Sequence, residues 1–304
     1  MYCRVNMQGS ILMVRSLILN YPDIISSNLI LSSKKLIELD TKRLKFIRSG
    51  WGEDVVDNSD VWELRYKSDD RIIEGYFARP KEVNGKIPLV IWNRGGSRKA
   101  GAIDKFLARG IYGEIASWGY TVLASQYRKN DQFGGDEIND VLNLIELANE
   151  FEECDASQIG MEGWSRGGMM TYLAMTKTDK LKCAVIISGL ADLVRNSDMS
   201  ADMSEVYMKL FGSSDEREFR GELERRSAVN FFREIKKDIP VLLIHGTNDT
   251  RVSYQDSVEM FSNLKSNGNE VEFISIEGGD HYLKKNRKEV NALRRNWYKK
   301  YFKN

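Results

Sequence analysis

The chain has 304 residues, of which 42% are hydrophobic and 29% charged, so it can bury a sizeable core without disulfide staples. Lysine and arginine total 45 against 44 aspartate and glutamate residues, and this balance gives no reason to expect binding to nucleic acid or to a membrane. Three scattered cysteines, Cys3, Cys154 and Cys183, are too few for a disulfide framework and favour reduced thiols in a cytoplasmic protein.

Residues 1–60 predict an N-terminal helical extension. The apolar run Ile11–Val14 faintly resembles a signal peptide, but Arg15 interrupts it and no small-residue cleavage site follows. No stretch of the sequence approaches the roughly 20 apolar residues that a membrane-spanning helix needs. The segment "SSKKLIELDTKRLKFI" (32–47) has the pattern of an amphipathic helix.

From residue 61 to residue 304 we expect a single α/β domain. Two alternating runs around Ser68-Asp69-Asp70, within residues 61–80, predict a β-hairpin. Apolar strands then alternate with helical periodicity, which predicts a mostly parallel twisted sheet with helices on both faces and the hairpin at its N-terminal edge. The expected strands are 87–92, 120–127, 159–164, 183–188, 240–245 and 271–276; the expected helices are 103–119, 137–151, one after Gly167, and a closing helix through Val290, Leu293, Trp297 and Tyr301.

Residues 190–238 interrupt this alternation with a long, helical and methionine-rich segment. We interpret it as an insertion that forms a small lid over the edge of the sheet. Met203 and Tyr207 are candidates to line an apolar substrate pocket under this lid. Residues at helical spacing also pack a lid onto its domain, and the sequence favours that second interpretation.

Ser165 is the candidate nucleophile. It lies in "GWSRGG" (163–168), a G-x-S-x-G pattern between a predicted strand and a predicted helix. This pattern is typical of a sharp strand-to-helix turn that presents the serine hydroxyl beyond the carboxyl edge of the sheet, where ligands bind in such folds.

A serine hydroxyl needs a general base, and the chain contains only two histidines. His281 follows the last strand in "GGDHYL", so its loop is expected at the same edge of the sheet as Ser165. His245 ends the strand 240–245, and we expect its ring to brace the turn "HGTND". His281 is therefore the candidate base.

Three aspartates are candidates to orient His281. Asp249 follows the penultimate strand and gives the chain order Ser, Asp, His that is typical of α/β-hydrolases. Asp192, in the loop after the strand 183–188, is the rival acid. Asp280 precedes His281 directly and is expected to face solvent. Asp249 is the preferred assignment.

Two backbone N–H groups are candidate donors to an oxyanion. One belongs to Arg166, the residue after the nucleophile, and the other to Gly95 in the loop "NRGGS" (93–97) after the strand 87–92. The Arg94 side chain is a further candidate for contact with substrate.

Together these motifs resemble the catalytic domain of the prolyl oligopeptidase family of serine peptidases. The resemblance rests on "GWSRGG", "PVLLIHGTNDTRV", "GGDHYL", "QFGGDEINDV" and the hairpin "LRYKSDDRIIEGYFARP", and it extends over residues 62–304. Many members carry an N-terminal β-propeller, for which sixty residues are too few, so we expect a hydrolase domain without one. Several relatives have Tyr or His in place of Arg94, which leaves the Gly95 N–H as the preferred donor.

The leading functional hypothesis is a serine hydrolase that cleaves peptide or amide bonds of small peptides through an acyl-enzyme, with no metal or organic cofactor. Two histidines far apart in the sequence do not favour a catalytic zinc site. A carboxylesterase acting on small acyl esters uses the same machinery and stays open, as does a catalytically silent hydrolase fold that binds ligands. The oligomeric state is not predicted.

Overall fold

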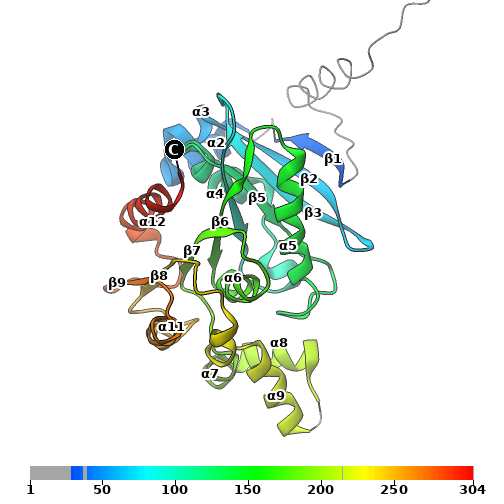
Figure 1. Ribbon diagram of the computed structural model, residues 1–304, viewed down its shortest axis with the longest axis vertical. Helices are drawn as coiled ribbons and strands as arrows, with labels where there is room; N and C mark the ends of the chain where they lie inside the picture. Colours follow the sequence, from blue (N-terminus) through cyan, green and yellow to red (C-terminus); the bar gives the residue numbers. More distant parts are fainter. Residues whose placement is uncertain (1–28, 37–39, 214, 304) are drawn as a thin grey trace, which may run out of the picture.

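The computed structural model describes residues 29–36, 40–213 and 215–303 (Figure 1). A nine-stranded sheet crosses the described part of the chain in the order β1-β2-β3-β5-β4-β6-β7-β8-β9. The strands are β1 Ile30–Lys35, β2 Ser59–Ser68, β3 Arg71–Pro80, β4 Ile87–Asn93, β5 Thr121–Ser125, β6 Cys154–Trp164, β7 Leu181–Ile187, β8 Val241–Gly246 and β9 Val271–Ile276.

Both antiparallel and parallel pairing occur in this sheet. The pairs β1–β2, β2–β3 and β3–β5 are antiparallel, and every neighbouring pair from β5 to β9 is parallel. The hairpin turns at Asp69, whose φ of 54° lies in the left-handed region, between the paired residues Ser68 and Arg71. The mixed sheet and its hairpin confirm the predicted fold class.

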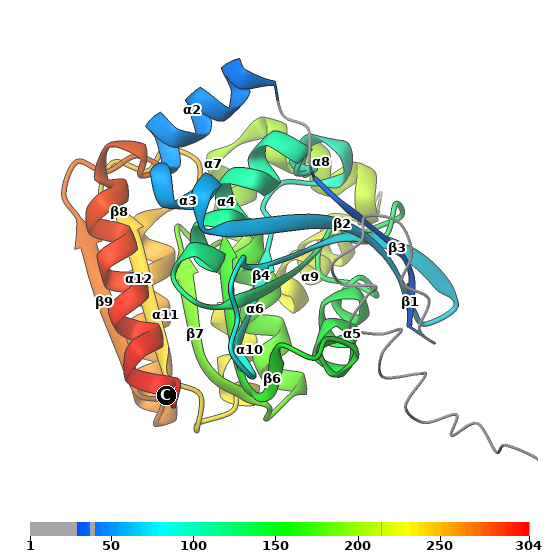
Figure 2. The ribbon, with the colours of Figure 1, turned by 90° about the horizontal axis from the view of Figure 1, so that it is seen from above.

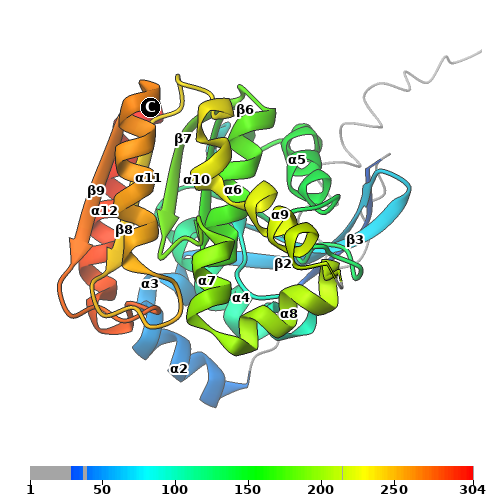
Figure 3. The same cartoon turned by 90° about the horizontal axis from the view of Figure 1, so that it is seen from below.

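Helices cover the two faces of the sheet. α5, α6 and α11 pack on one face, where Figure 3 shows them side by side, and α4 and α12 pack on the other (Figure 2). The helices are α2 Thr41–Trp51, α3 Glu53–Asp57, α4 Lys105–Ser117, α5 Ile138–Leu147, α6 Arg166–Lys177, α7 Leu193–Met199, α8 Ala201–Phe211, α9 Glu216–Arg226, α10 Ala228–Phe231, α11 Tyr254–Asn267 and α12 Arg287–Tyr301. No helix in the described ranges is long and apolar enough to cross a membrane.

The N-terminal segment differs from the expected amphipathic helix over 32–47. Residues 30–35 form β1, which pairs with β2 at the edge of the sheet, and α2 begins only at Thr41. The Asp40 carboxylate accepts a hydrogen bond from Arg43 N and so caps α2, which explains why the helix begins there. The signal-peptide-like run 11–14 lies outside the described residues.

Residues 190–238 form α7 to α10, of which α7, α8 and α9 stand together at the lower end of the molecule in Figure 1. The Tyr207 ring of α8 meets the Phe133 ring edge to face at 5.1 Å, and Arg226 Nε of α9 donates to Gln132 O. The segment therefore packs on the loop between β5 and α5. Its action as a lid stays a prediction.

Candidate active site

Ser165 lies at the turn between β6 and α6, in a backbone conformation that few non-glycine residues adopt. Its φ of 60° and ψ of −125° are outside the allowed regions for helix and strand. The turn is fixed by backbone hydrogen bonds: Ser165 N donates to Ile187 O at 3.0 Å, and Ser165 O accepts from Gly168 N and Leu190 N. Strand β7 therefore holds the strained residue in place.

The glycines on either side of Ser165 are required by close approaches of backbone. A Cβ atom on Gly163 would lie 2.0 Å from Gly167 O, and one on Gly167 would lie 1.9 Å from Asn93 O. Real Cβ atoms do not approach other atoms so closely. Without side chains at these two positions, α6 can begin directly against the end of β4.

The structure brings Ser165, His281 and Asp249 into one hydrogen-bonded line, although they are separated by 116 and 32 positions in the sequence. His281 Nε2 lies 3.1 Å from Ser165 Oγ, and His281 Nδ1 lies 2.7 Å from Asp249 Oδ2. The His281 side chain is 4% exposed, while Ser165 is half-buried. The imidazole is thus shielded from water while the hydroxyl stays accessible.

Asp249 accepts four hydrogen bonds. Oδ1 accepts from the backbone N–H groups of Arg251 and Val252, at 2.8 and 3.0 Å, and Oδ2 accepts from His281 Nδ1 and from His245 Nε2 at 3.1 Å. Burial raises the pKa of this carboxyl, but the hydrogen bonds from His245 and His281 outweigh burial and hold the pKa of Asp249 well below its usual range. Asp249 is therefore ionised in the folded protein at neutral pH.

His245 is fully buried directly behind Asp249. Its Nδ1 lies 2.7 Å from Ser257 Oγ, and its Nε2 faces Asp249 Oδ2 and, at 3.3 Å, Val252 O. Because two acceptors face Nε2, that nitrogen carries the proton and the Ser257 hydroxyl donates to Nδ1. The ring braces the turn "HGTND", and it also supports the carboxylate that holds His281.

The two other candidate acids lie elsewhere. Asp192 caps α7, with Oδ1 accepting from Arg195 N at 3.0 Å and Oδ2 paired with the Arg195 guanidinium at 3.3 Å. Asp280 is exposed, and its Oδ1 accepts from Tyr282 N and Leu283 N. Among the described residues, neither carboxylate forms a hydrogen bond or ion pair with the His281 ring.

The two candidate oxyanion donors flank Ser165. Arg166 N is the first amide of α6, so it has no acceptor within the helix. Gly95 packs against Ser165, because a Cβ atom added to the glycine would lie 3.1 Å from Ser165 Cβ and 3.1 Å from the Trp164 ring. The glycine lets this stretch of backbone reach the serine.

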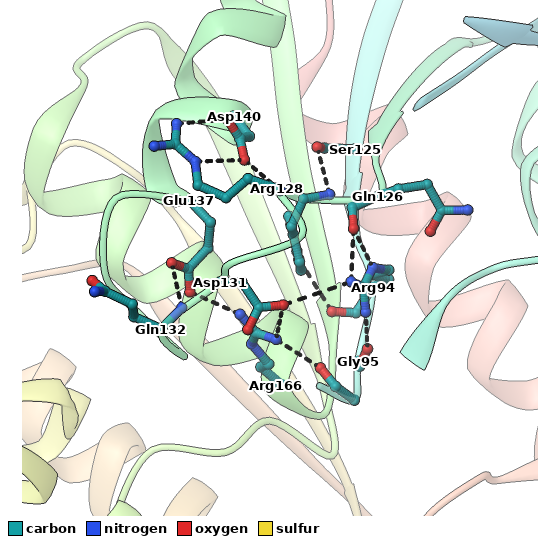
Figure 4. A network of polar contacts seen from close by, with 12 residues as sticks. Arg94, Gly95, Ser125, Gln126, Arg128, Asp131, Gln132, Glu137, Asp140 and Arg166 are labelled. Carbon is teal, nitrogen blue, oxygen red and sulfur yellow. Dashed lines mark hydrogen bonds and ion pairs between the residues drawn. The ribbon is translucent and has the colours of Figure 1, made fainter. Parts of the chain in front are cut away.

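The three side chains considered for substrate contact are largely engaged inside the protein. Arg94 is 2% exposed, and its guanidinium donates to Gln126 O through Nε and Nη2 and to Gly95 O through Nη1 (Figure 4). Tyr207 is fully buried and donates its hydroxyl to Asn196 Oδ1 at 2.8 Å. Met203 is half-buried against the core. In this structure Arg94 and Tyr207 hold protein groups rather than face solvent.

A buried cluster of charges that the sequence did not reveal lies behind the loop 93–97. Arg166 Nη1 lies 3.1 Å from Asp131 Oδ2 and 2.9 Å from Gly96 O, and Arg166 Nη2 lies 2.8 Å from Glu137 Oε1 (Figure 4). We name this the rim network and define it by its members Arg94, Tyr127, Asp131, Glu137 and Arg166. Asp131 and Glu137 come from the glycine-rich loop before α5, where acidic residues are usually solvated. The stretch 132–141, which contains Glu137, carries part of the family resemblance, but nothing in its residue pattern indicates that these carboxylates are buried.

The described residues contain no group of three or more His, Cys, Asp or Glu side chains arranged to hold a metal ion.

Aromatic rings pack beside His281. The centroid of the Trp164 ring lies 4.9 Å from that of the His281 ring and 5.3 Å from that of the Tyr282 ring. Trp164 Nε1 donates to His281 O at 3.0 Å, so this aromatic pair also fixes the histidine loop.

The chain is similar in sequence to known peptidases and to a putative esterase. Residues 119–304 match the prolyl oligopeptidase family. The chain is 27% identical over 242 residues to the uncharacterized peptidase YtmA of Bacillus subtilis, covering 77% of this chain and 91% of that protein. It is 28% identical over 153 residues to the putative esterase YitV of the same organism, covering 47% of this chain and 60% of that protein.

Among solved structures, the fold is similar to the Pyrococcus horikoshii acylaminoacyl peptidase. The TM-score is 0.69 at 22% identity, over 81% of this chain. The chain spans 42% of the length of that peptidase. This likeness concerns the fold alone.

Proposed function

The chain is a member of the prolyl oligopeptidase family, and from this membership we propose that it is a serine peptidase that hydrolyses small peptides through an acyl-enzyme on Ser165. The observation that carries the proposal is the hydrogen-bonded line from Ser165 Oγ through His281 to Asp249. These are the groups, in the order of contact, that acyl transfer by a serine requires.

In the first step, Ser165 Oγ attacks the carbonyl carbon of the scissile bond. The ionised Asp249 accepts a hydrogen bond from His281 Nδ1–H and so keeps the proton on that nitrogen, which leaves the Nε2 lone pair facing the serine hydroxyl. Nε2 takes the hydroxyl proton as Oγ bonds to carbon, and then gives it to the leaving amine as the carbon–nitrogen bond breaks. The acyl group remains on Ser165.

In the second step, a water molecule takes the place of the amine. His281 Nε2 accepts a proton from the water as its oxygen bonds to the acyl carbon, and returns that proton to Ser165 Oγ when the ester bond breaks. In both steps, the backbone N–H groups of Arg166 and Gly95 donate to the oxygen of the tetrahedral intermediate. A single donor of this kind contributes about 10²–10³ in rate.

A carboxylesterase acting on small acyl esters is the second candidate. The same residues catalyse ester hydrolysis without any change of geometry, and the similarity to YitV, which is named a putative esterase, favours this candidate. Peptide bonds have the poorer leaving group, so a peptidase must protonate that group more effectively. The two functions therefore differ in how the enzyme treats the leaving group, and a matched pair of substrates separates them.

The proposal is tested by labelling the folded full-length chain with a fluorophosphonate and locating the adduct by mass spectrometry. We expect one adduct on Ser165, none in Ser165→Ala, and strongly slowed labelling in His281→Ala. Asp280→Asn, next to the histidine but outside the hydrogen-bonded line, is the matched control and should label like the wild type. Absence of an adduct on Ser165 in folded protein would leave a silent, ligand-binding fold.

Peptidase and esterase are then separated with substrates that share one aminoacyl group, presented as a naphthylamide and as a p-nitrophenyl ester. We expect Ser165-dependent turnover of both. Turnover of the ester alone across a panel of aminoacyl groups would replace the peptidase by the esterase.

A further inference from the structure

Side chains of the rim network donate hydrogen bonds to three consecutive backbone carbonyl groups of the loop 93–97, which also contains the Gly95 N–H. The Tyr127 hydroxyl donates to Arg94 O at 3.1 Å, Arg94 Nη1 donates to Gly95 O at 3.1 Å, and Arg166 Nη1 donates to Gly96 O at 2.9 Å. Each donor comes from a fully or nearly fully buried side chain. A loop anchored at every carbonyl of a glycine pair cannot turn its peptide planes freely.

The Tyr127 contact bears directly on the oxyanion donor. Arg94 C=O and Gly95 N–H belong to the same peptide unit, which is planar and trans, so the two groups point in opposite directions. A hydrogen bond that fixes the direction of Arg94 C=O therefore fixes the direction of Gly95 N–H. Burial raises the pKa of Tyr127 above its ordinary value, so its hydroxyl keeps its proton and can donate to Arg94 O.

The Arg166 side chain connects the two halves of the proposed oxyanion hole. The backbone N–H of Arg166 is one proposed donor. Its guanidinium donates a hydrogen bond to the carbonyl oxygen of Gly96, and Gly96 follows Gly95, whose N–H is the other proposed donor. Asp131 and Glu137 bind the same guanidinium, and three backbone N–H groups, those of Gln132, Gly134 and Gly135, donate to Glu137. The arginine is thus fixed against a rigid loop.

The aromatic rings of this loop complete the support. The guanidinium carbons of Arg94 and Arg166 lie 4.6 and 5.1 Å from the Tyr127 ring centroid, and that of Arg166 lies 4.4 Å from the Phe133 ring centroid. Tyr127 and Phe133 both have φ of 59°, in the left-handed region. Strain of this kind persists only where the surroundings over-determine the backbone.

Resting on the proposed acyl-transfer function, we propose that the Arg166 guanidinium and the Tyr127 hydroxyl are positioning groups that hold the Gly95 and Arg166 N–H donors in the geometry of the oxyanion hole. They touch neither substrate nor reacting atoms. Their loss leaves substrate binding intact and weakens the stabilisation of the tetrahedral intermediate.

The test compares Tyr127→Phe with Tyr298→Phe, because each substitution removes one buried hydroxyl and keeps the ring. The Tyr298 hydroxyl donates to Glu162 Oε2 at 2.7 Å, on the face of the sheet that α4 and α12 cover. With p-nitrophenyl butyrate as substrate, we expect Tyr127→Phe to lower kcat about tenfold with KM changed less than twofold. Tyr298→Phe should keep both constants within twofold of the wild type.

Arg166→Lys, which keeps the charge but loses the fork of donors, provides the second variant, and we expect a loss of about 10–100-fold in kcat. In both rim variants the affinity for phenylboronic acid, which forms a tetrahedral adduct with the serine, should fall in parallel with kcat/KM. A purely structural role would lower the melting temperature without this parallel.

The outcomes separate the two proposals. A wild-type protein that shows neither Ser165-dependent hydrolysis nor labelling would end the proposed function, and this inference with it. An active wild type with Tyr127→Phe indistinguishable from Tyr298→Phe would overturn the inference alone. If Arg166→Lys fails to fold, Tyr127→Phe decides.

Discussion

Two buried ionic networks lie on different sides of the central sheet, and their contrast shows what buried charge does in this protein. The rim network, around Arg166, contacts the loops that surround Ser165. The second, which we name the interior network, lies between β6, α4 and α12 and consists of Glu114, Glu162, Arg287, Arg294 and Tyr298. Both bury two carboxylates against arginines.

The partners of the two networks differ. Glu162 takes hydrogen bonds from Arg294 at 2.6 and 3.0 Å, from Tyr298 and from Trp92 Nε1, all side chains of regular strands and helices. In the rim network, the arginines donate to backbone oxygens of irregular loops. Hydrophobic packing already orders strands and helices, whereas irregular loops need such bonds to adopt a single conformation. We therefore expect the interior network to govern stability and the rim to govern rate.

Asp249→Asn gives the largest expected effect. An asparagine cannot hold His281 with Nδ1 protonated, so we expect kcat to fall about 10⁴-fold, equivalent to about 5.5 kcal/mol in the barrier, with the melting temperature changed by only a few degrees. Hydrolysis of p-nitrophenyl butyrate measures the rate and calorimetry the stability. Asp192→Asn is the matched control; if it were the crippling change instead, the acid assignment would be wrong.

Arg294→Met tests the interior network. It leaves Glu162 and Glu114 buried without their shared cation, and we expect a loss of about 3–5 kcal/mol of unfolding free energy in urea titrations. At a temperature where the variant is folded, kcat should stay within twofold of the wild type. A tenfold loss of kcat in folded Arg294→Met would show that the two networks are coupled.

His245→Phe should show a smaller effect on the acid side of the site. It removes one hydrogen bond to the Asp249 carboxylate, worth about 1.5–3 kcal/mol, and leaves the other three in place. We expect kcat to fall about tenfold with an unchanged KM. His245→Gln, which offers an amide donor, should recover part of this loss; an equal loss in both variants would assign the histidine to packing alone.

The smallest expected effect is a change in acid sensitivity. Burial raises the pKa of Glu137, but the Arg166 charge and backbone donors outweigh it, so in the folded protein this pKa lies below the ordinary value of 4.5. As the pH falls, Glu137 therefore takes up a proton in the unfolded chain before it does so in the folded protein. The ionised Glu137 stabilises the fold above about pH 4.5, and this stabilisation is lost as the pH falls through the lower pKa of the folded protein. Glu137→Gln should make urea midpoints fall less steeply with acid than in the wild type. Equal slopes would count against this ion pair.

The sequence predicted the positions of the regular elements well where periodicity and burial agree. The run 271–276 is strand β9 without change of bounds, and the hairpin turns at the predicted residues. The prediction of a helix was wrong for residues 32–35, which belong to strand β1, because a short half-polar run has no strong period. Residues 30–35 form a strand because their backbone pairs with the edge of β2, a contact that the local sequence does not specify.

The sequence alone also selected Ser165, His281 and Asp249, because glycine spacing, chain order and a supply of only two histidines left few combinations. What only the tertiary structure decided is how loops from distant parts of the chain support those residues. Nothing local marks Tyr127 or Glu137 as part of the buried network behind the loop 93–97, nor His245 as a support of Asp249. A charge or hydroxyl in a loop faces water by default, and it becomes a buried anchor only when folding closes other elements around it.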